Sequence, residues 1–136
     1  PRLPAARIGT LLTQLAERQE LFSVTGGCHG ALLAPAEGSG PRFAAEDVGR
    51  HNALDKAIGA AARAGVDFSR TIAVLSGRAG YDLVVKCLRL RIPVIASVSA
   101  PSALAFDLCH AAGATLLGFV RGDRHQVYCG QERLLP

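Results

Sequence analysis

Four stretches of the chain place apolar residues three and four positions apart, a spacing that predicts amphipathic helices. In the first stretch Ile8, Leu11, Leu12 and Leu15 share one face. The four helices are expected at about 8–20, 50–64, 81–90 and 102–112. A glycine follows the second and the fourth, as is common at helix ends.

Short apolar runs between these helices predict strands. They fall at 21–24, 31–34, 42–48, 71–75, 92–96, 114–120 and 126–129. The runs 31–34 and 42–48 flank a turn rich in Gly and Pro and predict a hairpin. Because strands alternate with helices along the rest of the chain, the pattern predicts a single α/β domain with a mixed, mostly parallel sheet between helix layers. The tail after residue 129 is expected only as a surface end.

Three loops follow the carboxyl ends of predicted strands, at 46–52, 76–78 and 97–102. In open α/β sheets such loops gather at one edge, where ligands bind. They bring hydroxyl groups, helix starts and the arginines Arg50 and Arg78. Guanidinium groups and free backbone N–H groups suit phosphate or diphosphate better than they suit proton chemistry. We therefore expect an anion-binding edge.

The first of these loops concentrates polar chemistry, because Glu46, Asp47, Arg50, His51 and Asn52 fall within seven consecutive positions. Capping of the following helix by Asp47 or Asn52 explains one of these residues. It does not explain the whole group. A functional site and a capped helix start both stay open from the residues alone.

The stretch 119–125 offers a second candidate site. Gly122 and Asp123 are typical of a hairpin turn, which by itself needs no ligand. The aromatic Phe119 beside Arg121 and Arg124 is also suited to stacking a base and holding phosphate.

Composition narrows the class of ligand. The 136 residues are 49% hydrophobic and 19% charged, which suits one folded domain with a real core. The net charge of +4 permits an anionic ligand such as a nucleotide. No run of Lys or Arg marks a nucleic-acid arm, so no nucleic-acid partner is expected. No apolar run approaches the ~18 residues of a membrane span, so no membrane partner is expected either.

The four cysteines, Cys28, Cys87, Cys109 and Cys129, contain no CxxC pair. Cys87 and Cys109 fall in helical patterns and are expected to be buried. A reduced, cytoplasmic protein is the simplest interpretation. Cys28 and His29 lie in the glycine-rich stretch 25–30, where a nucleophile with its base, half of a metal site and a tight turn all stay open. No second Cys/His pair has zinc spacing, so no metal is expected.

Four motifs together resemble the FdhD family, the formate dehydrogenase accessory sulfurtransferases. They are EDVGRHNALDK at 46–56, SGR at 76–78, RIPVIASVSAPSAL at 91–104 and TLLGFVRGDRHQVY at 115–128. The resemblance implies a cytidine-deaminase-like three-layer fold. It also implies a carrier that passes sulfur from a cysteine desulfurase to the molybdenum-bis(molybdopterin guanine dinucleotide) cofactor of formate dehydrogenase. In the family the sulfur is held as a persulfide on a CxxC motif that precedes this segment.

The CxxC motif is missing from this chain, and so is methionine. We expect a longer protein with the CxxC upstream and no catalytic residue in this segment, where Cys28 is the candidate substitute. The alternative is a cofactor- or nucleotide-binding module without sulfur-transfer chemistry. The zinc-deaminase signature HxE…PCxxC does not occur, so deamination is not expected.

The resemblance also implies binding residues for the cofactor. Arg78, Arg121 and Arg124 would bind phosphates. Asp47 or Glu46 would read the guanine edge, and His51 would orient the site. The full expected set is Phe119, Val120, Arg121, Gly122, Asp123, Arg124, Glu46, Asp47, Arg50, His51, Gly77, Arg78, His29 and Ser99. GDP is the expected surrogate ligand, and a homodimer is the expected assembly.

Overall fold

The computed structural model describes residues 1–18 and 28–136. The predicted strand 21–24 and the first part of the glycine-rich stretch, 25–27, lie outside the described residues. The helices are α1 (Ala6–Glu17), α3 (Arg50–Arg63), α4 (Tyr81–Arg89) and α5 (Ala103–Ala112), with short 3-10 turns η1 (Phe68–Arg70) and η2 (Gln131–Arg133). The strands are β1 (Leu3–Pro4), β2 (His29–Pro35), β3 (Phe43–Asp47), β4 (Thr71–Leu75), β5 (Val94–Ser97), β6 (Thr115–Arg121), β7 (Arg124–Cys129) and β8 (Leu134–Leu135).

The four predicted helices are confirmed, and their ends follow from local chemistry. α3 begins at Arg50, and Gly65 follows its end with a φ of 75°. The Ser102 Oγ caps α5 by accepting a hydrogen bond from the Ala105 N–H at 3.1 Å. Gly113 ends α5 in the left-handed conformation, which glycine adopts without steric cost.

Within the described residues, six strands form one mixed sheet in the order β3-β2-β4-β5-β6-β7. β4, β5 and β6 pair in parallel, whereas β2–β3, β2–β4 and β6–β7 pair antiparallel. The predicted hairpin is confirmed, with Ala31 opposite Ala45. Because β2 is antiparallel to both of its neighbours, β3 runs in the same direction as β4, β5 and β6. The carboxyl ends of these strands therefore lie at one edge of the sheet.

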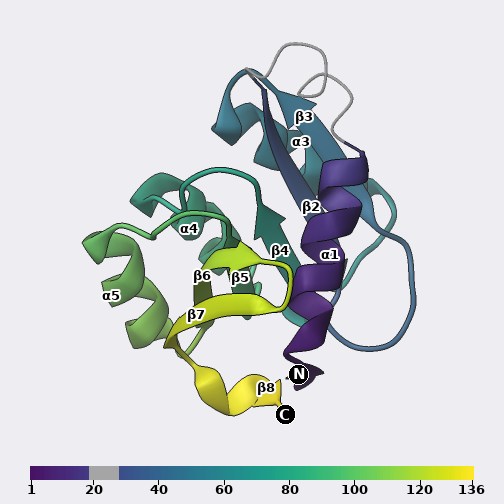
Figure 1. The fold of residues 1–136 in the computed structure, drawn as a ribbon. Coiled ribbons are helices and arrows are strands. Elements are labelled where there is room, and N and C mark those ends of the chain that lie inside the picture. Colours follow the sequence, from purple (N-terminus) through teal and green to yellow (C-terminus); the bar gives the residue numbers. More distant parts are fainter. Residues whose placement is uncertain (19–27) are drawn as a thin grey trace.

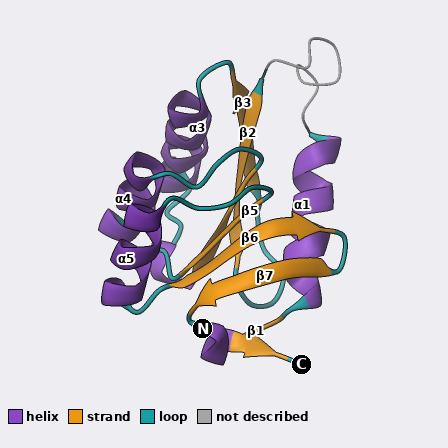
Figure 2. Ribbon diagram, turned by 60° about the vertical axis from the view of Figure 1, so that its left-hand side comes forward, coloured by secondary structure: helices purple, strands orange, loops and turns teal. Residues whose placement is uncertain are grey.

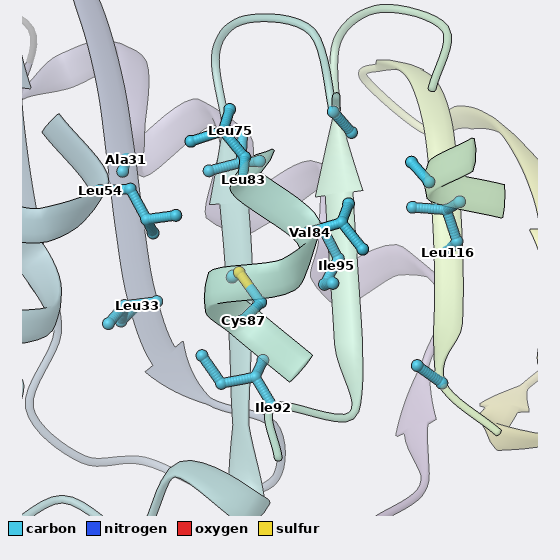
Figure 3. Packing of buried hydrophobic residues seen from close by; sticks show 14 of the residues in the cluster. Ala31, Leu33, Leu54, Leu75, Leu83, Val84, Cys87, Ile92, Ile95 and Leu116 are labelled. Carbon is cyan, nitrogen blue, oxygen red and sulfur yellow. The ribbon is translucent and has the colours of Figure 1, made fainter. Parts of the chain in front are cut away.

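Helices cover both faces of this sheet, as expected (Figure 2). α3, α4 and α5 lie on one face, over a core that includes Leu54, Leu83 and Ile95 (Figure 3). α1 lies on the other face, where Leu11 and Leu15 are fully buried against the sheet. The three layers therefore depend on two separate apolar clusters, one on each side of the sheet.

β4 illustrates why the sequence of a central strand is an unbroken run of apolar residues. Its Ile72 and Val74 belong to the α1 side, while Ala73 and Leu75 belong to the side of α3, α4 and α5. Successive residues of a strand point to opposite faces. A strand that helices cover on both sides must therefore be apolar at every position.

The tail departs from its expected role as a simple surface end. Leu134 and Leu135 form β8, which pairs in parallel with β1 near the N-terminus. The Ala5 N–H donates to the Leu135 carbonyl at 3.2 Å, which extends this pairing. The two ends of the chain consequently lie together (Figure 1). Two-residue strands at opposite ends of a sequence leave no periodic pattern, so sequence reasoning missed this pairing.

α1 approaches the β6–β7 hairpin so closely that one helical position requires glycine. A Cβ atom on Gly9 would overlap the carbonyl oxygen of Gly122. Gly122 lies in the turn between β6 and β7 with a φ of 60°, a conformation that favours glycine. Two glycines, one on each element, thus set the distance between helix and hairpin.

Gly9→Ala is expected to destabilise the protein by about 1–3 kcal/mol, the usual cost of overpacking. Gly59→Ala is the matched control, because Gly59 lies inside α3 with only the flexible Arg63 side chain near its missing Cβ. That substitution is expected to stabilise the protein by about 0.5–1 kcal/mol, since alanine is the better helix former. Urea denaturation measures both changes, and equal effects would contradict the backbone contact at Gly9.

Candidate functional site

The three loops at the strand ends gather at one edge, as expected. We call this region the carboxyl edge; it comprises 46–52, 76–80, 97–102 and His29 at the start of β2. The Ser76 N–H donates to the Gly30 carbonyl at 3.0 Å, and the Gly30 N–H donates to the Ser76 Oγ at 2.7 Å. The Ser102 N–H donates to the Ala79 carbonyl at 3.2 Å. These bonds connect β2, the β4–α4 loop and the β5–α5 loop.

His29 joins the first loop to the second. It lies opposite Asp47 in the register of β2 with β3. A Cβ atom on Gly77 would lie 3.1 Å from the His29 Nδ1, so the imidazole packs against the backbone of the 76–78 loop. The structure therefore brings together His29, Asp47 and Gly77, which the sequence placed in three separate motifs.

Asp47 is held by several partners at the end of β3. Its Oδ1 accepts from the Gly49 N–H at 3.0 Å and from the Asn52 amide at 3.4 Å. Its Oδ2 pairs with the Lys56 ammonium at 2.7 Å. The Lys56 ammonium, the Gly49 N–H and the Asn52 amide together lower the pKa of Asp47 to about 2. The carboxylate is therefore charged at every physiological pH.

The start of α3 gives the carboxyl edge positive potential. Arg50 and His51 occupy its first turn, where backbone N–H groups have no partner within the helix. Gly49 precedes them and has no side chain that could cap these groups. Arg78 is exposed in the neighbouring loop. A helix N-terminus beside arginine side chains favours an anion.

A hollow of about 530 Å³ lies between α1 and the β6–β7 hairpin. We call it the hairpin hollow; its lining residues are Leu12, Thr13, Ala16, Val98, Phe119, Val120, Arg121, Gly122 and Arg124. Every expected binding residue of the 119–124 stretch except Asp123 lines it. The Phe119 N–H donates to the Ser99 carbonyl at 3.4 Å, so the β5–α5 loop connects the hollow to the carboxyl edge.

Phe119 is presented to the hairpin hollow by an irregular backbone. The register of β6 with β7 shifts between Gly118 and Arg121, and Phe119 has a φ of 52°. A non-glycine residue in this region costs of order 1 kcal/mol, a strain that clusters at functional sites. Phe119 is 51% exposed, whereas the adjacent Val120 is 3% exposed and anchors the strand in the core. The bulge thus holds an aromatic ring outward on a fixed support.

Large exposed apolar side chains also collect around the carboxyl edge. In the described part of the chain they are Val48, Tyr81, Leu104 and Phe119, which are 76%, 45%, 61% and 51% exposed. Val48 follows β3, Tyr81 and Leu104 lie in the first turns of α4 and α5, and Phe119 lies near the end of β6. Apolar side chains around a polar site are typical of a surface that another molecule covers.

Three of the four cysteines are buried thiols with raised pKa values. Cys87 and Cys109 are fully buried, as expected, and burial raises the pKa of each thiol to about 12. Burial also raises the pKa of Cys129. Cys28 is 8% exposed next to His29. Across residues 1–18 and 28–136, no group of three His, Cys, Asp or Glu side chains is arranged to hold a metal ion.

Two parts of this site escaped sequence reasoning. Lys56 belongs to the EDVGRHNALDK stretch, but the sequence predicted no role for it. Thr13 and Ala16 line the hairpin hollow from α1, and their helical pattern carried no sign of a ligand. Only the contact between α1 and the hairpin reveals them.

Comparison with known proteins identifies the family. The model of the FdhD/NarQ family matches residues 1–135. The chain belongs to the FdhD/NarQ family. This FdhD/NarQ chain is 50% identical to the sulfur carrier protein FdhD of Anaeromyxobacter dehalogenans strain 2CP-C over 139 residues, which cover 97% of the chain and 48% of that relative. It is also 50% identical to the sulfur carrier protein FdhD of Thermoplasma volcanium over 117 residues, 86% of the chain and 42% of that relative.

A crystal structure from Desulfotalea psychrophila, described as a proposed formate dehydrogenase accessory protein, superimposes with a TM-score of 0.88. The two sequences are 34% identical, and the match covers 98% of this chain and 57% of that one. The expected α/β fold and family are therefore confirmed. The FdhD/NarQ chain spans about half the length of the curated relatives it matches. Among the described residues, no helix has both the length and the apolar character of a membrane span.

Asp47 is expected to make stability depend on pH in a defined range. Its folded pKa of about 2 lies below the ordinary value of about 3.9 for an unfolded chain. Its contribution is therefore complete above about pH 4 and disappears as the pH falls through about 2. The free energy of unfolding of wild type minus that of Asp47→Asn should consequently shrink over this range, as measured by urea denaturation.

Asp67 does not contribute to the difference in unfolding free energy between wild type and Asp47→Asn. Hydrogen bonds from Ser69 lower its pKa as well, but Asp67 is the same in both proteins and its effect cancels. A difference between wild type and Asp47→Asn that stayed constant from pH 6 to pH 2.5 would contradict the ion pair with Lys56.

Proposed function

We propose that this chain is the cofactor-binding part of a cytoplasmic sulfur carrier that serves formate dehydrogenase. Its substrate is the molybdenum-bis(molybdopterin guanine dinucleotide) cofactor, and the chain binds the guanine nucleotide ends. The family and the names of its relatives support the sulfur-carrier role. The observation that carries the nucleotide-binding role is the hairpin hollow, where Phe119, Arg121 and Arg124 surround one space.

The hairpin hollow suits a nucleotide in size and chemistry. Its volume of about 530 Å³ falls within the usual range for small-molecule sites. Arg121 and Arg124 offer planar forks of donors that match phosphate oxygens. The exposed ring of Phe119 offers a face on which a base stacks. A nucleotide that extends from the hollow along the carboxyl edge would approach Arg78 and the start of α3.

The sulfur-transfer step belongs to the longer protein in this proposal. The sulfur is held as a persulfide on a CxxC cysteine, supplied by a cysteine desulfurase. Cys87, Cys109 and Cys129 are unsuited to that step, because they are buried and their raised pKa values keep them protonated. This burial also supports the alternative, a binding module without sulfur-transfer chemistry.

The apolar rim of the carboxyl edge supports a protein partner at the same site. Val48 and Leu104 are more exposed than Phe119, and a nucleotide in the hairpin hollow does not require them. We propose that formate dehydrogenase docks over this rim when it receives the cofactor. The desulfurase and a second copy of the chain, as a homodimer, are the other proposed partners.

The proposal predicts selective binding of GDP over ADP by the 136-residue chain in calorimetric titration. Arg121→Ala and Arg124→Ala should each weaken GDP binding about tenfold or more, since hydrogen bonds to charged groups contribute about 1.5–3 kcal/mol. Arg89→Ala is the matched control, because Arg89 is exposed in the last turn of α4, away from the hollow. Its GDP affinity should equal that of wild type.

Two outcomes would overturn this proposal. Wild-type affinity in both arginine variants would remove the hairpin hollow from the binding site. Equal affinity for GDP and ADP would remove guanine recognition from this chain and leave a general nucleotide module.

A further inference from the structure

The aspartate that the motif offers as a guanine reader already has partners within the protein on both carboxylate oxygens. Guanine presents two donors, N1–H and the exocyclic amino group, and reading them takes both oxygens of one carboxylate. In Asp47, the Oδ1 accepts from the Gly49 N–H at 3.0 Å, and the Oδ2 pairs with Lys56 at 2.7 Å. The side chain is also only 22% exposed. A guanine edge would have to compete with these partners for both oxygens.

Lys56 makes a second contact that ties the same elements together. Its ammonium group also donates to the Glu46 carbonyl at 3.1 Å. One side chain from α3 thus contacts both the last carboxylate of β3 and the backbone immediately before it. The Asn52 amide reaches Asp47 from the first turn of α3 at 3.4 Å. Strand end, turn and helix start are therefore joined through one carboxylate and one ammonium group.

The turn between β3 and α3 is shaped to permit these contacts. A Cβ atom on Gly49 would lie 3.3 Å from the Asn52 amide nitrogen and 3.8 Å from the Asp47 Oδ1. The next residues are Arg50 and His51, which begin α3. Their position at the carboxyl edge follows from the geometry of this turn.

We propose that Asp47 and Lys56 are positioning residues that lock the β3–α3 turn and so place the anion-binding start of α3, and that Asp47 does not read guanine. This inference rests on the proposed nucleotide-binding function. It assigns a role to Lys56, and it moves base recognition away from Asp47. We call the Asp47–Lys56 ion pair, with its hydrogen bonds to the Gly49 N–H and the Glu46 carbonyl, the clamp. The clamp increases the affinity for an anion because Arg50, His51 and the N–H groups of the first turn are already ordered before the anion binds.

The chain contains a matched control ion pair on the same helix. Asp55 of α3 pairs with Lys86 of α4 at 2.8 Å, with both side chains partly exposed. This pair lies between two helices and contacts neither the turn nor the hairpin hollow. Asp55→Asn and Lys86→Ala therefore remove a similar ion pair and leave the clamp intact.

The first test needs no ligand. Amide hydrogen exchange and ¹H–¹⁵N spectra of the 136-residue chain should show that Asp47→Asn and Lys56→Ala each reduce protection of the Gly49 N–H and shift the amide signals of 50–52. Lys86→Ala should leave these signals unchanged. If Lys56→Ala has no effect at Gly49, the clamp does not exist.

The second test compares GDP with IDP, which lacks the exocyclic amino group of guanine. Asp47→Asn and Lys56→Ala should weaken both ligands by the same factor, at most about fivefold, because a partly exposed ion pair contributes up to about 1 kcal/mol to holding the start of α3 in place. The double variant should bind no more weakly than Asp47→Asn, because the two side chains act through one contact. Asp55→Asn should bind both ligands as wild type does.

A guanine reader gives a different pattern. Asp47→Asn would then abolish the preference for GDP over IDP, and Lys56→Ala would leave GDP affinity unchanged or raise it. That result would overturn the inference and preserve the proposed function. If wild type binds neither nucleotide, the proposed function fails, and the exchange experiment still decides whether the clamp exists.

Discussion

The shared direction of β3, β4, β5 and β6 is the constraint on which the rest of this structure depends. It follows from the parallel pairing of β4, β5 and β6 and from the insertion of β2, antiparallel, between β3 and β4. Each of these strands then ends at the same edge, and α3, α4 and α5 each begin there. Helix N-termini, arginines and exposed apolar side chains accumulate at that edge as a consequence.

The face of the sheet opposite α3, α4 and α5 is covered by α1. α1 packs on it by burying Ile8, Leu11 and Leu15. Its other flank touches the β6–β7 hairpin through glycine backbone, since side chains there would force the two apart. This close approach leaves the hairpin hollow beside it, and the bulge at Phe119 places an aromatic ring in its wall. The close contact of α1 with the hairpin at Gly9 thus determines where the hairpin hollow lies further along the helix.

Much of the candidate site could be predicted from residue types, but the roles within it could not. The 46–52 loop was singled out because carboxylates, arginine and histidine crowd together there. The residue types in this loop do not distinguish a carboxylate that binds a ligand from one that stabilises a turn. The distinction depends on Lys56, whose ammonium reaches back to Asp47 only once α3 has packed against β3. In the same way, His29 and Gly77 meet because β2 lies between β3 and β4.

The sequence by itself determined the four helices, the β2–β3 hairpin, the layered α/β class and the gathering of three loops at one edge. These features follow from periodicity, glycine positions and the alternation of strands with helices, all of which act over short stretches of chain. The tertiary structure alone decided the pairing of β1 with β8, the placement of α1 on its own face, the hairpin hollow and the partners of Asp47. The physical reason is that periodicity records which side chains are buried, whereas a contact between distant segments depends on how closely their backbones approach after packing.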